Sequence, residues 1–106
     1  MITNNIKNFK NGWFIGDFSP SLFKTKEFEI AVKYYKKGDS EPKHYHKKIT
    51  EYNLITKGKI KICDKELSEG DIFVFQPNEI ADGVILEDAI LVVVKIPSDP
   101  TDKYSC

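Results

Sequence analysis

This 106-residue chain lacks the features that mark disulfide-rich, nucleic-acid-binding, membrane-spanning or secreted proteins. It has only two cysteines, Cys63 and Cys106, in no Cys-x-x-Cys or Cys-His arrangement, so we expect no disulfide scaffold and a reducing cytoplasm. Its 16 basic and 16 acidic residues cancel, so no strong field invites nucleic acid or an anionic membrane. No apolar run approaches the ~20 residues that span a bilayer, and the first ten residues lack the hydrophobic region of a signal peptide. We therefore expect a cytoplasmic protein without nucleic-acid or membrane partners.

Helical periodicity is missing too, since no segment keeps an apolar face over three turns. Aromatic residues are frequent instead, with seven Phe, five Tyr and one Trp, and together with β-branched residues they favour strands. Residues 27–35 alternate between apolar and polar side chains, as a half-buried strand does. Glycine, proline and aspartate separate such segments. We predict an all-β antiparallel sandwich or barrel, with strands at 12–18, 27–35, 43–48, 51–56, 59–63, 66–68, 72–75, 80–86 and 89–96.

The length of the chain allows one hydrophobic core and not two. We predict a single domain, residues 1–106, with its core at about 12–98 and terminal extensions at 1–11 and 99–106. Within it, the pairs 57–58 and 87–88 are interpreted as turns between strands. The run from Ala89 to Ile96 is almost continuously apolar. That strand is expected to be covered on both faces or to lie at a subunit contact.

The only two histidines, His44 and His46, stand two residues apart in the stretch from Gly38 to Gly58. Residues i and i+2 of a strand point to the same side, so both imidazoles would project into one space. Glu51 follows five residues later, after a short polar link into the next strand. Two imidazoles and one carboxylate suit a divalent transition metal with open coordination positions. The alternative is that both histidines are packed or surface residues without a ligand.

The order Gly38, His44-x-His46, Glu51 and Gly58 resembles the first motif of the cupin family, with every anchoring residue at that family's spacing. The resemblance implies a small RmlC-like jelly-roll barrel. It also implies that the two histidines and the glutamate bind a metal inside the barrel, and that the last glycine turns the chain between strands. The implied cofactor is a divalent transition metal: Fe, Mn, Ni or Zn.

A second cupin motif combines Gly-Asp, a hydrophobic strand, a proline and a later histidine ligand. The stretch from Gly70 to Asn78 resembles its beginning, but Ala81 stands where the histidine is expected, followed by Asp82. Asp82 could supply a carboxylate to the metal. Equally, Asp82-Gly83 could form a turn or bulge, where Asp and Gly are the usual residues; the turn is the interpretation we favour. Three protein ligands would still leave positions for water or substrate.

Lysines and tyrosines are concentrated around the histidine segment, from Lys33 to Lys37 and at Lys43, Lys47 and Lys48. Such clusters can bind single-stranded nucleic acid by stacking and phosphate contacts. In a chain of zero net charge, solvated strand ends are the better interpretation. A milder alternative stays open, in which these lysines attract an anionic small molecule, such as a phosphorylated sugar, to the mouth of the barrel.

Three functions remain open. The first is a metal-dependent enzyme, an oxygenase or isomerase, that acts on a small polar metabolite such as a carbohydrate or carboxylate. The second is a non-catalytic module that binds a small molecule in the same pocket. The third resembles the metal-free sugar-nucleotide isomerases and epimerases of this superfold, with His44 or His46 as general base and Glu51 or Asp82 orienting it. We expect a homodimer in which a partner covers the strand from Ala89 to Ile96.

Overall fold

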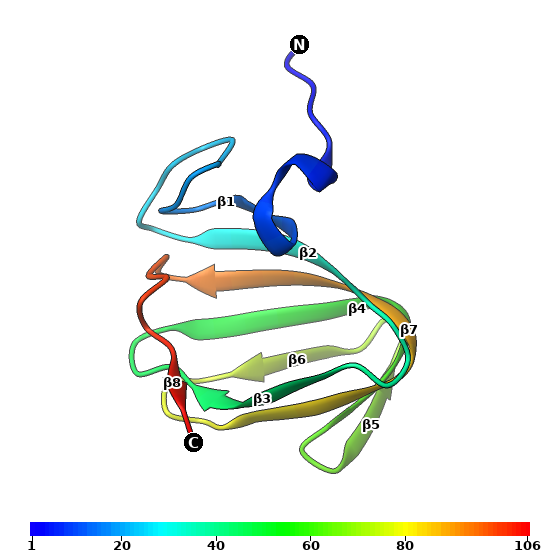
Figure 1. Cartoon of the computed structure of the whole chain (residues 1–106). Coiled ribbons are helices and arrows are strands. Elements are labelled where there is room, and N and C mark those ends of the chain that lie inside the picture. Colours follow the sequence, from blue (N-terminus) through cyan, green and yellow to red (C-terminus); the bar gives the residue numbers. More distant parts are fainter.

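The computed structural model describes residues 1–106 and consists almost entirely of antiparallel strands (Figure 1). The all-β prediction is therefore confirmed. Neither of the two helices, each three residues long, has the length or apolarity needed to cross a membrane. The elements are η1 Ile6–Asn8, η2 Lys10–Gly12, β1 Trp13–Ile15, β2 Glu29–Tyr35, β3 Ser40–Tyr45, β4 Thr50–Ile62, β5 Lys65–Ser68, β6 Ile72–Phe75, β7 Ala81–Ile96 and β8 Tyr104–Ser105.

Two long strands, β4 and β7, form the spine of the barrel. They pair antiparallel along nearly their whole lengths, from Thr50 opposite Ile96 to Ile62 opposite Gly83. The end of the spine that holds Thr50 is flanked by β6 on one side and β2 on the other, with β1 beyond β2. The end that holds Ile62 is flanked by β5 and β3, with β8 beyond β3. The spine thus joins two halves of a single sheet (Figure 1).

The spine bends around Gly58, where the pairing register of β4 and β7 shifts. Gly58 has a φ of +92°, which L side chains rarely adopt, and a Cβ there would lie 2.2 Å from the carbonyl oxygen of Asp88. The predicted turns at 57–58 and 87–88 are wrong, because both strands run through these positions. The physical reason is that cross-strand pairing continues past the bend, with Lys59 opposite Glu87.

The predicted turn at Asp82-Gly83 is also wrong, because β7 runs through both residues. Ala81 pairs with His44, and Gly83 pairs with Glu41. The register shifts between these two pairs, so β3 carries an extra residue opposite β7. The bulge that was the alternative interpretation is therefore present, but on the neighbouring strand.

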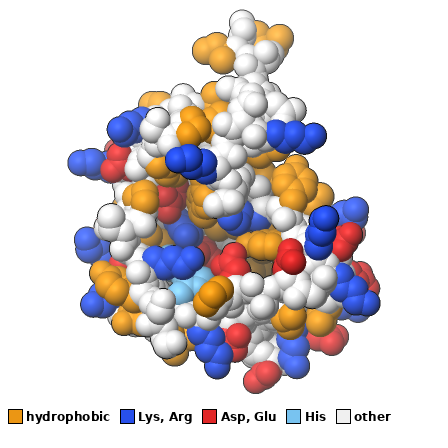
Figure 2. Space-filling model, in the orientation of Figure 1, with side chains coloured by type: hydrophobic (Ala, Val, Ile, Leu, Met, Phe, Trp, Pro, Cys, Tyr) orange, Lys and Arg blue, Asp and Glu red, His pale blue; other side chains and the backbone are white.

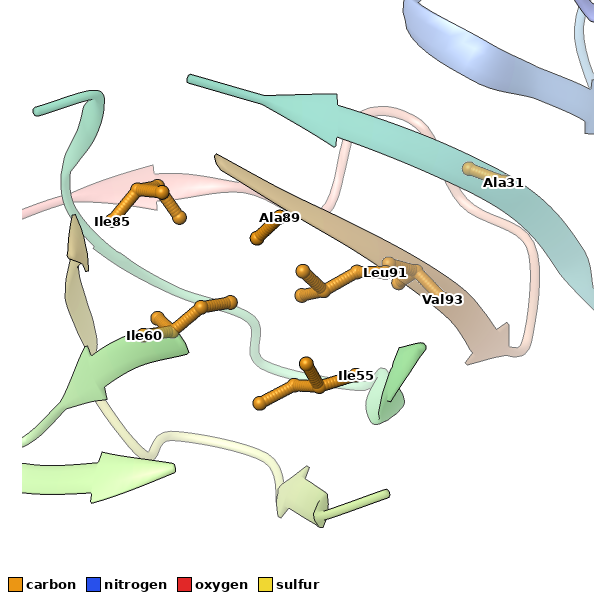
Figure 3. Close-up of a cluster of buried hydrophobic side chains, with 7 residues drawn as sticks. All are labelled: Ala31, Ile55, Ile60, Ile85, Ala89, Leu91 and Val93. Carbon is orange, nitrogen blue, oxygen red and sulfur yellow. The ribbon is translucent and has the colours of Figure 1, made fainter. Parts of the chain in front are cut away.

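One cluster of buried apolar side chains connects the two halves of the sheet (Figure 3). Ile55 and Leu91 belong to the half next to β2, and Ile60 and Ile85 to the half next to β3. Because all four share one core, the two halves face each other across the interior. Full burial of one such side chain contributes roughly 1.5–3 kcal/mol. The cluster comprises Ala31, Ile55, Ile60, Ile85, Ala89, Leu91 and Val93.

The reverse face of β2, β7, β4 and β6 is apolar as well, yet it stays exposed. Tyr52 stands opposite Val74 and Val94, and Leu54 stands opposite Ile72 and Val92, so these side chains adjoin one another. The run from 89 to 96 is thus covered on its inner face and partly open on its outer one. We call the apolar reverse face of these four strands the outer face. Its exposed members are Tyr34, Tyr52, Leu54, Ile72, Val74 and Ile96.

Candidate metal centre and ligand cavity

The two histidines lie side by side within the protein. His44 is 7% exposed and His46 is 5% exposed, and their ring centroids are 5.4 Å apart. The strand predicted at 43–48 ends earlier, at Tyr45, so His46 is the first residue beyond β3. Its ring still lies next to that of His44, as expected for side chains two residues apart.

Both imidazoles are oriented by backbone carbonyls. The Nδ1 atom of His44 lies 3.0 Å from the carbonyl oxygen of Pro42, and the Nδ1 atom of His46 hydrogen-bonds the carbonyl of Asp102. A carbonyl only accepts, so Nδ1 carries the proton in each ring, and the Nε2 atom of the neutral imidazole keeps a free lone pair. The Nε2 atom of His46 is buried and has no hydrogen-bond partner. This is the orientation that second-shell carbonyls impose on metal-binding histidines.

Asp102 organises the loop that follows β3. Its carboxylate accepts three backbone N–H groups, from Lys47 at 3.0 Å, Lys48 at 2.8 Å and Ile49 at 3.0 Å, and the residue is 2% exposed. Burial would raise its pKa, but these three N–H donors outweigh burial and hold the pKa below its usual value. Asp102 therefore fixes the loop with its side chain and the His46 ring with its carbonyl.

Nothing in the local sequence indicates this role for Asp102. It lies in the polar segment after residue 98, and the loop that it binds is more than 50 positions away. Only the pairing of β8 with β3 brings the segment against that loop, through His44 opposite Ser105 and Tyr45 opposite Tyr104. The C-terminal segment thus contributes directly to the candidate site.

Glu51 stands on β4 beside His46. Its Oε1 atom lies 3.6 Å from His46 Nε2 and 3.8 Å from Lys95 Nζ, and its Oε2 atom accepts a hydrogen bond of 3.0 Å from Asn53. Burial would raise the pKa of this carboxyl, but the contacts with His46, Lys95 and Asn53 prevail and lower it. Glu51 is therefore held as a carboxylate whose negative charge faces the histidine.

Asp82 lies further out. Its side chain is 50% exposed, and its Oδ2 atom forms a loose ion pair of 3.7 Å with Lys43. Ala81, at the position expected for a second-motif histidine, pairs with His44 across the strands. No three His, Cys, Asp or Glu side chains lie close enough together to hold a metal ion. Of the predicted ligands, the structure brings His44 next to His46 and His46 next to Glu51, and it leaves Asp82 near the surface.

Lys95 is a half-buried neighbour of Glu51 that the motifs did not indicate. Its Nζ atom lies 4.7 Å from the centre of the Trp13 ring, and Lys33 Nζ lies 5.5 Å from the same ring. Burial lowers the pKa of Lys33, whose ammonium also donates to the carbonyl of Asn11 at 3.0 Å. Trp13 thus lies close to two cations at the end of the barrel where β1 joins β2.

A cavity of about 80 Å³ opens beside His44 and Glu51. In Figure 2 the molecule is hollowed near its centre, with acidic and basic side chains around the hollow. Tyr35 lines the cavity, whereas Tyr52 lies on the outer face. The polar or charged lining residues include Tyr35, Asp39, Glu41, His44, Glu51, Asn53 and Asp82.

The predicted lysine cluster does not line this cavity. Lys33 lines an outer groove that shares Tyr35, Asp39 and Glu41 with the cavity. Lys47 lies 4.2 Å from the Tyr104 ring centre, and Lys48 pairs with Asp99 at 3.3 Å. These lysines therefore serve mainly as local surface partners.

Comparison with known proteins identifies the fold of the chain. No protein-family model and no curated protein sequence matches the chain. Among solved structures, an uncharacterized conserved protein with a double-stranded beta-helix domain from Klebsiella pneumoniae is similar with a TM-score of 0.71 and 18% identity, over 77% of this chain and 72% of that one. An RmlC-like cupin from Shewanella frigidimarina gives a TM-score of 0.64 and 20% identity, over 72% of this chain and 71% of that one.

A longer protein is similar as well. Bacillus subtilis oxalate decarboxylase, described with Mn(II) centers, gives a TM-score of 0.64 and 19% identity over 76% of this chain and 24% of its own. At these identities the likeness concerns the fold. The chain therefore has the cupin fold, the double-stranded β-helix, as the resemblance of its sequence implied.

Proposed function

We propose that this protein is a metal-dependent cupin that binds or transforms a small polar metabolite in its interior cavity. The supporting observation is the orientation of the two imidazoles, each of which donates Nδ1–H to a backbone carbonyl and keeps the Nε2 lone pair free. A buried Nε2 atom without a partner is costly unless something binds it. The Nε2 atoms of His44 and His46 and the carboxylate of Glu51 would hold the metal.

The donor set suits Fe, Mn, Ni or Zn, because imidazole nitrogen with carboxylate oxygen is a common set for such ions. When bound, the metal would act as a Lewis acid that polarises a substrate oxygen or binds dioxygen. Other residues of the chain would orient the metal ligands and limit the access of water. Asp102 and Pro42 orient the rings, Asn53 orients the carboxylate of Glu51, and the apolar walls restrict water. Asp82 is the weaker fourth ligand, because Lys43 already pairs with it.

A metal-free site is the second candidate, and one observation favours it. The predicted ligands are not gathered into a group that could hold an ion, and the Lys95 ammonium already lies 3.8 Å from Glu51. Here the free Nε2 of His46 or His44 would be a general base beside Glu51, or the cavity would bind its ligand without catalysis.

Elemental analysis decides between these candidates. Protein purified without chelators or a metal-binding tag should contain close to one equivalent of metal. Glu51→Gln, which keeps the shape of the side chain, should lose most of it, and so should His46→Ala. Glu66→Gln, at an exposed position on β5, serves as the control and should keep its metal. Metal-free native protein, even after incubation with Fe, Mn, Ni and Zn salts, would refute the metal-dependent function, provided that circular dichroism shows a folded chain.

We also propose a homodimer formed through the outer face. Four neighbouring strands span about 19 Å, and four to five residues along them about 15 Å, so the patch measures roughly 300 Å² before side-chain relief. In the dimer this patch would form the apolar centre of an interface of standard size, which buries about 800 Å² per partner and has a polar rim. Its exposed members are uncharged, so a second copy related by a two-fold axis would meet no charge repulsion there.

A further inference from the structure

We propose that Lys95 is the resident counter-ion of Glu51, and that a metal must displace its ammonium from the Glu51 Oε1 atom in order to bind. Because it concerns a ligand of the proposed metal, this role rests on the proposed function. It gives the site a residue that sets metal affinity without being a ligand. The observation behind it is that one carboxylate oxygen, Oε1 of Glu51, lies 3.6 Å from His46 Nε2 and 3.8 Å from Lys95 Nζ.

The two oxygens of Glu51 are engaged differently. Oε2 accepts the hydrogen bond of 3.0 Å from Asn53, whereas Oε1 faces the unpartnered Nε2 atom of His46. Oε1 is therefore the oxygen positioned to share a metal with that imidazole. Since Nδ1 carries the proton of the neutral ring, the histidine brings no positive charge. The one cation within 4 Å of Oε1 is the Lys95 ammonium, which thus lies where the metal would need the charge of Glu51.

Strand register holds Lys95 in this position. On β7, Lys95 stands opposite Glu51 of β4 on one side and opposite Glu29 of β2 on the other. Directly opposed residues point to the same face of a sheet, so the three side chains form one row with the lysine in the middle. Glu29 is 4% exposed, and the side chain of Lys95 is 15% exposed. Charges attract more strongly in such a partly dry row than on an open surface.

The contact between Lys95 and Glu51 is loose enough to be exchanged. Its 3.8 Å exceeds the roughly 2.7–2.9 Å of a charge-assisted hydrogen bond. The ammonium also lies 4.7 Å from the centre of the Trp13 ring, whose face attracts cations. If Glu51 turns to a metal, Lys95 thus keeps an aromatic face and has a second carboxylate, Glu29, across the strand. Displacement costs the lysine one contact and does not leave its charge unpartnered.

The consequence is that Lys95 lowers the affinity of the site for a divalent ion, because its charge repels the ion and competes for the same oxygen. Lys95→Met keeps an unbranched chain and removes the charge. We expect this variant to bind Zn²⁺ and Mn²⁺ at least about tenfold more tightly than native protein. Lys95→Arg keeps the charge and should bind no more tightly than native protein. Both affinities are measured on metal-free protein, by competition with a chromophoric chelator for Zn²⁺ and by electron paramagnetic resonance of free Mn²⁺.

Lys33→Met is the matched control. Lys33 also lies over the Trp13 ring, at 5.5 Å, and its replacement changes the net charge equally. Its ammonium donates to the carbonyl of Asn11 and forms no ion pair with Glu51. Lys33→Met should therefore leave the metal affinity at the native value, whereas a general effect of net charge would change it as much as Lys95→Met does.

A double-mutant cycle tests the same contact without any metal. The midpoint of urea unfolding is measured in the presence of a chelator for native protein, Lys95→Met, Glu51→Gln and the double variant. Lys95→Met alone leaves a buried carboxylate without its counter-ion, so it should lower the midpoint. In the Glu51→Gln background no charge remains to be compensated, so the same change should lower the midpoint clearly less.

The role of Lys95 is overturned if folded Lys95→Met binds metal no more tightly than native protein, if Lys33→Met or Lys95→Arg tightens binding as much, or if the two substitutions are additive in the cycle. These outcomes differ from failure of the proposed function. A native protein that takes no metal, beside a Lys95→Met variant that does, would refute the metal function and leave the role of Lys95 standing. Metal in native protein with the same affinity in Lys95→Met would do the reverse, and no metal in either would refute both.

Discussion

The backbone carbonyl of Asp102 accepts the Nδ1–H of His46, while the carboxylate of the same residue accepts three N–H groups of the loop that follows. Asp102, a residue near the C-terminus, thus sets both the tautomer of the imidazole and the path of the loop beside it. This double contact connects the end of the chain to the motif near its middle. It is the contact through which stability and function of the candidate site are most directly coupled.

Asp102→Asn should lower both stability and metal affinity. An amide offers one acceptor oxygen where the carboxylate offers two, so at least one buried N–H loses its partner. That costs about 1–3 kcal/mol in the free energy of unfolding, measured by urea denaturation. Loss of ring orientation should weaken metal binding by about 10- to 100-fold. Asp64→Asn, the same change in an exposed turn, is the control, and equal effects of both variants would contradict this role for Asp102.

Gly58→Ala should be much more destabilising than Gly38→Ala. Both glycines have a φ near +90°, so alanine is strained at either position by about 1–2 kcal/mol. Only at Gly58 would the new Cβ also meet the backbone, at 2.2 Å from the oxygen of Asp88, whereas Gly38 has open space. We expect Gly58→Ala to lose at least about 2 kcal/mol beyond the loss at Gly38, by the scale of overpacking. Equal losses in thermal or urea unfolding would show that the bend does not depend on this close approach.

Glu29→Gln should change how stability depends on pH. Burial raises the pKa of Glu29, and this exceeds the opposing effects of Lys95 and of the hydrogen bond from Ser98 at 3.1 Å. The folded state therefore binds its proton more tightly than the unfolded state, in which the pKa is about 4.3. The stability of the native protein consequently falls as pH rises from that value through the folded pKa.

Since the glutamine variant cannot ionise, its stability relative to native protein should rise over the same pH window and level off above it. Urea unfolding between about pH 4 and 7 measures this difference. Glu66→Gln, at an exposed site, should follow the native curve. A Glu29→Gln curve parallel to the native one would contradict the raised pKa.

Ile72→Lys should dissociate the proposed dimer. Ile72 is 68% exposed at the β6 edge of the outer face, so lysine there should leave the monomer stable and bring two charges into an apolar interface. Light scattering coupled to gel filtration should give twice the monomer mass for native protein and the monomer mass for the variant. Leu22→Lys is the control at an exposed leucine outside the outer face. A native protein that is monomeric at high concentration would refute the dimer.

The positions of the strands were the part of the fold that the sequence predicted best. Residues 27–35 alternate clearly, and β2 covers Glu29–Tyr35. The segment 72–75 was predicted with the bounds that β6 has. These predictions succeeded because alternation reports directly which side of a sheet is buried. The ends of strands were harder to predict from the sequence. Lys57-Gly58 and Glu87-Asp88 are typical of turns, but β4 and β7 continue to pair through both positions.

The candidate site divides in a similar way. The spacing of His44 and His46 predicts two imidazoles in one space, and the structure places their rings 5.4 Å apart. Glu51 was included through its motif, and it lies beside His46. Asp82 was predicted as a ligand or a turn residue; it lies in a strand and pairs with Lys43. Metal binding by these residues stays a prediction.

The sequence by itself determined where most of the strand segments lie and that two histidines share a side, because both follow from the two-residue period of an extended chain. Only the tertiary structure decided which distant groups surround those histidines. Asp102 reaches His46 and Glu41 joins Glu51 at one cavity through the pairing of strands far apart in the chain. Orientation of a ring, burial of a carboxylate and the charge of a cavity are properties of these non-local contacts, and no local pattern encodes them.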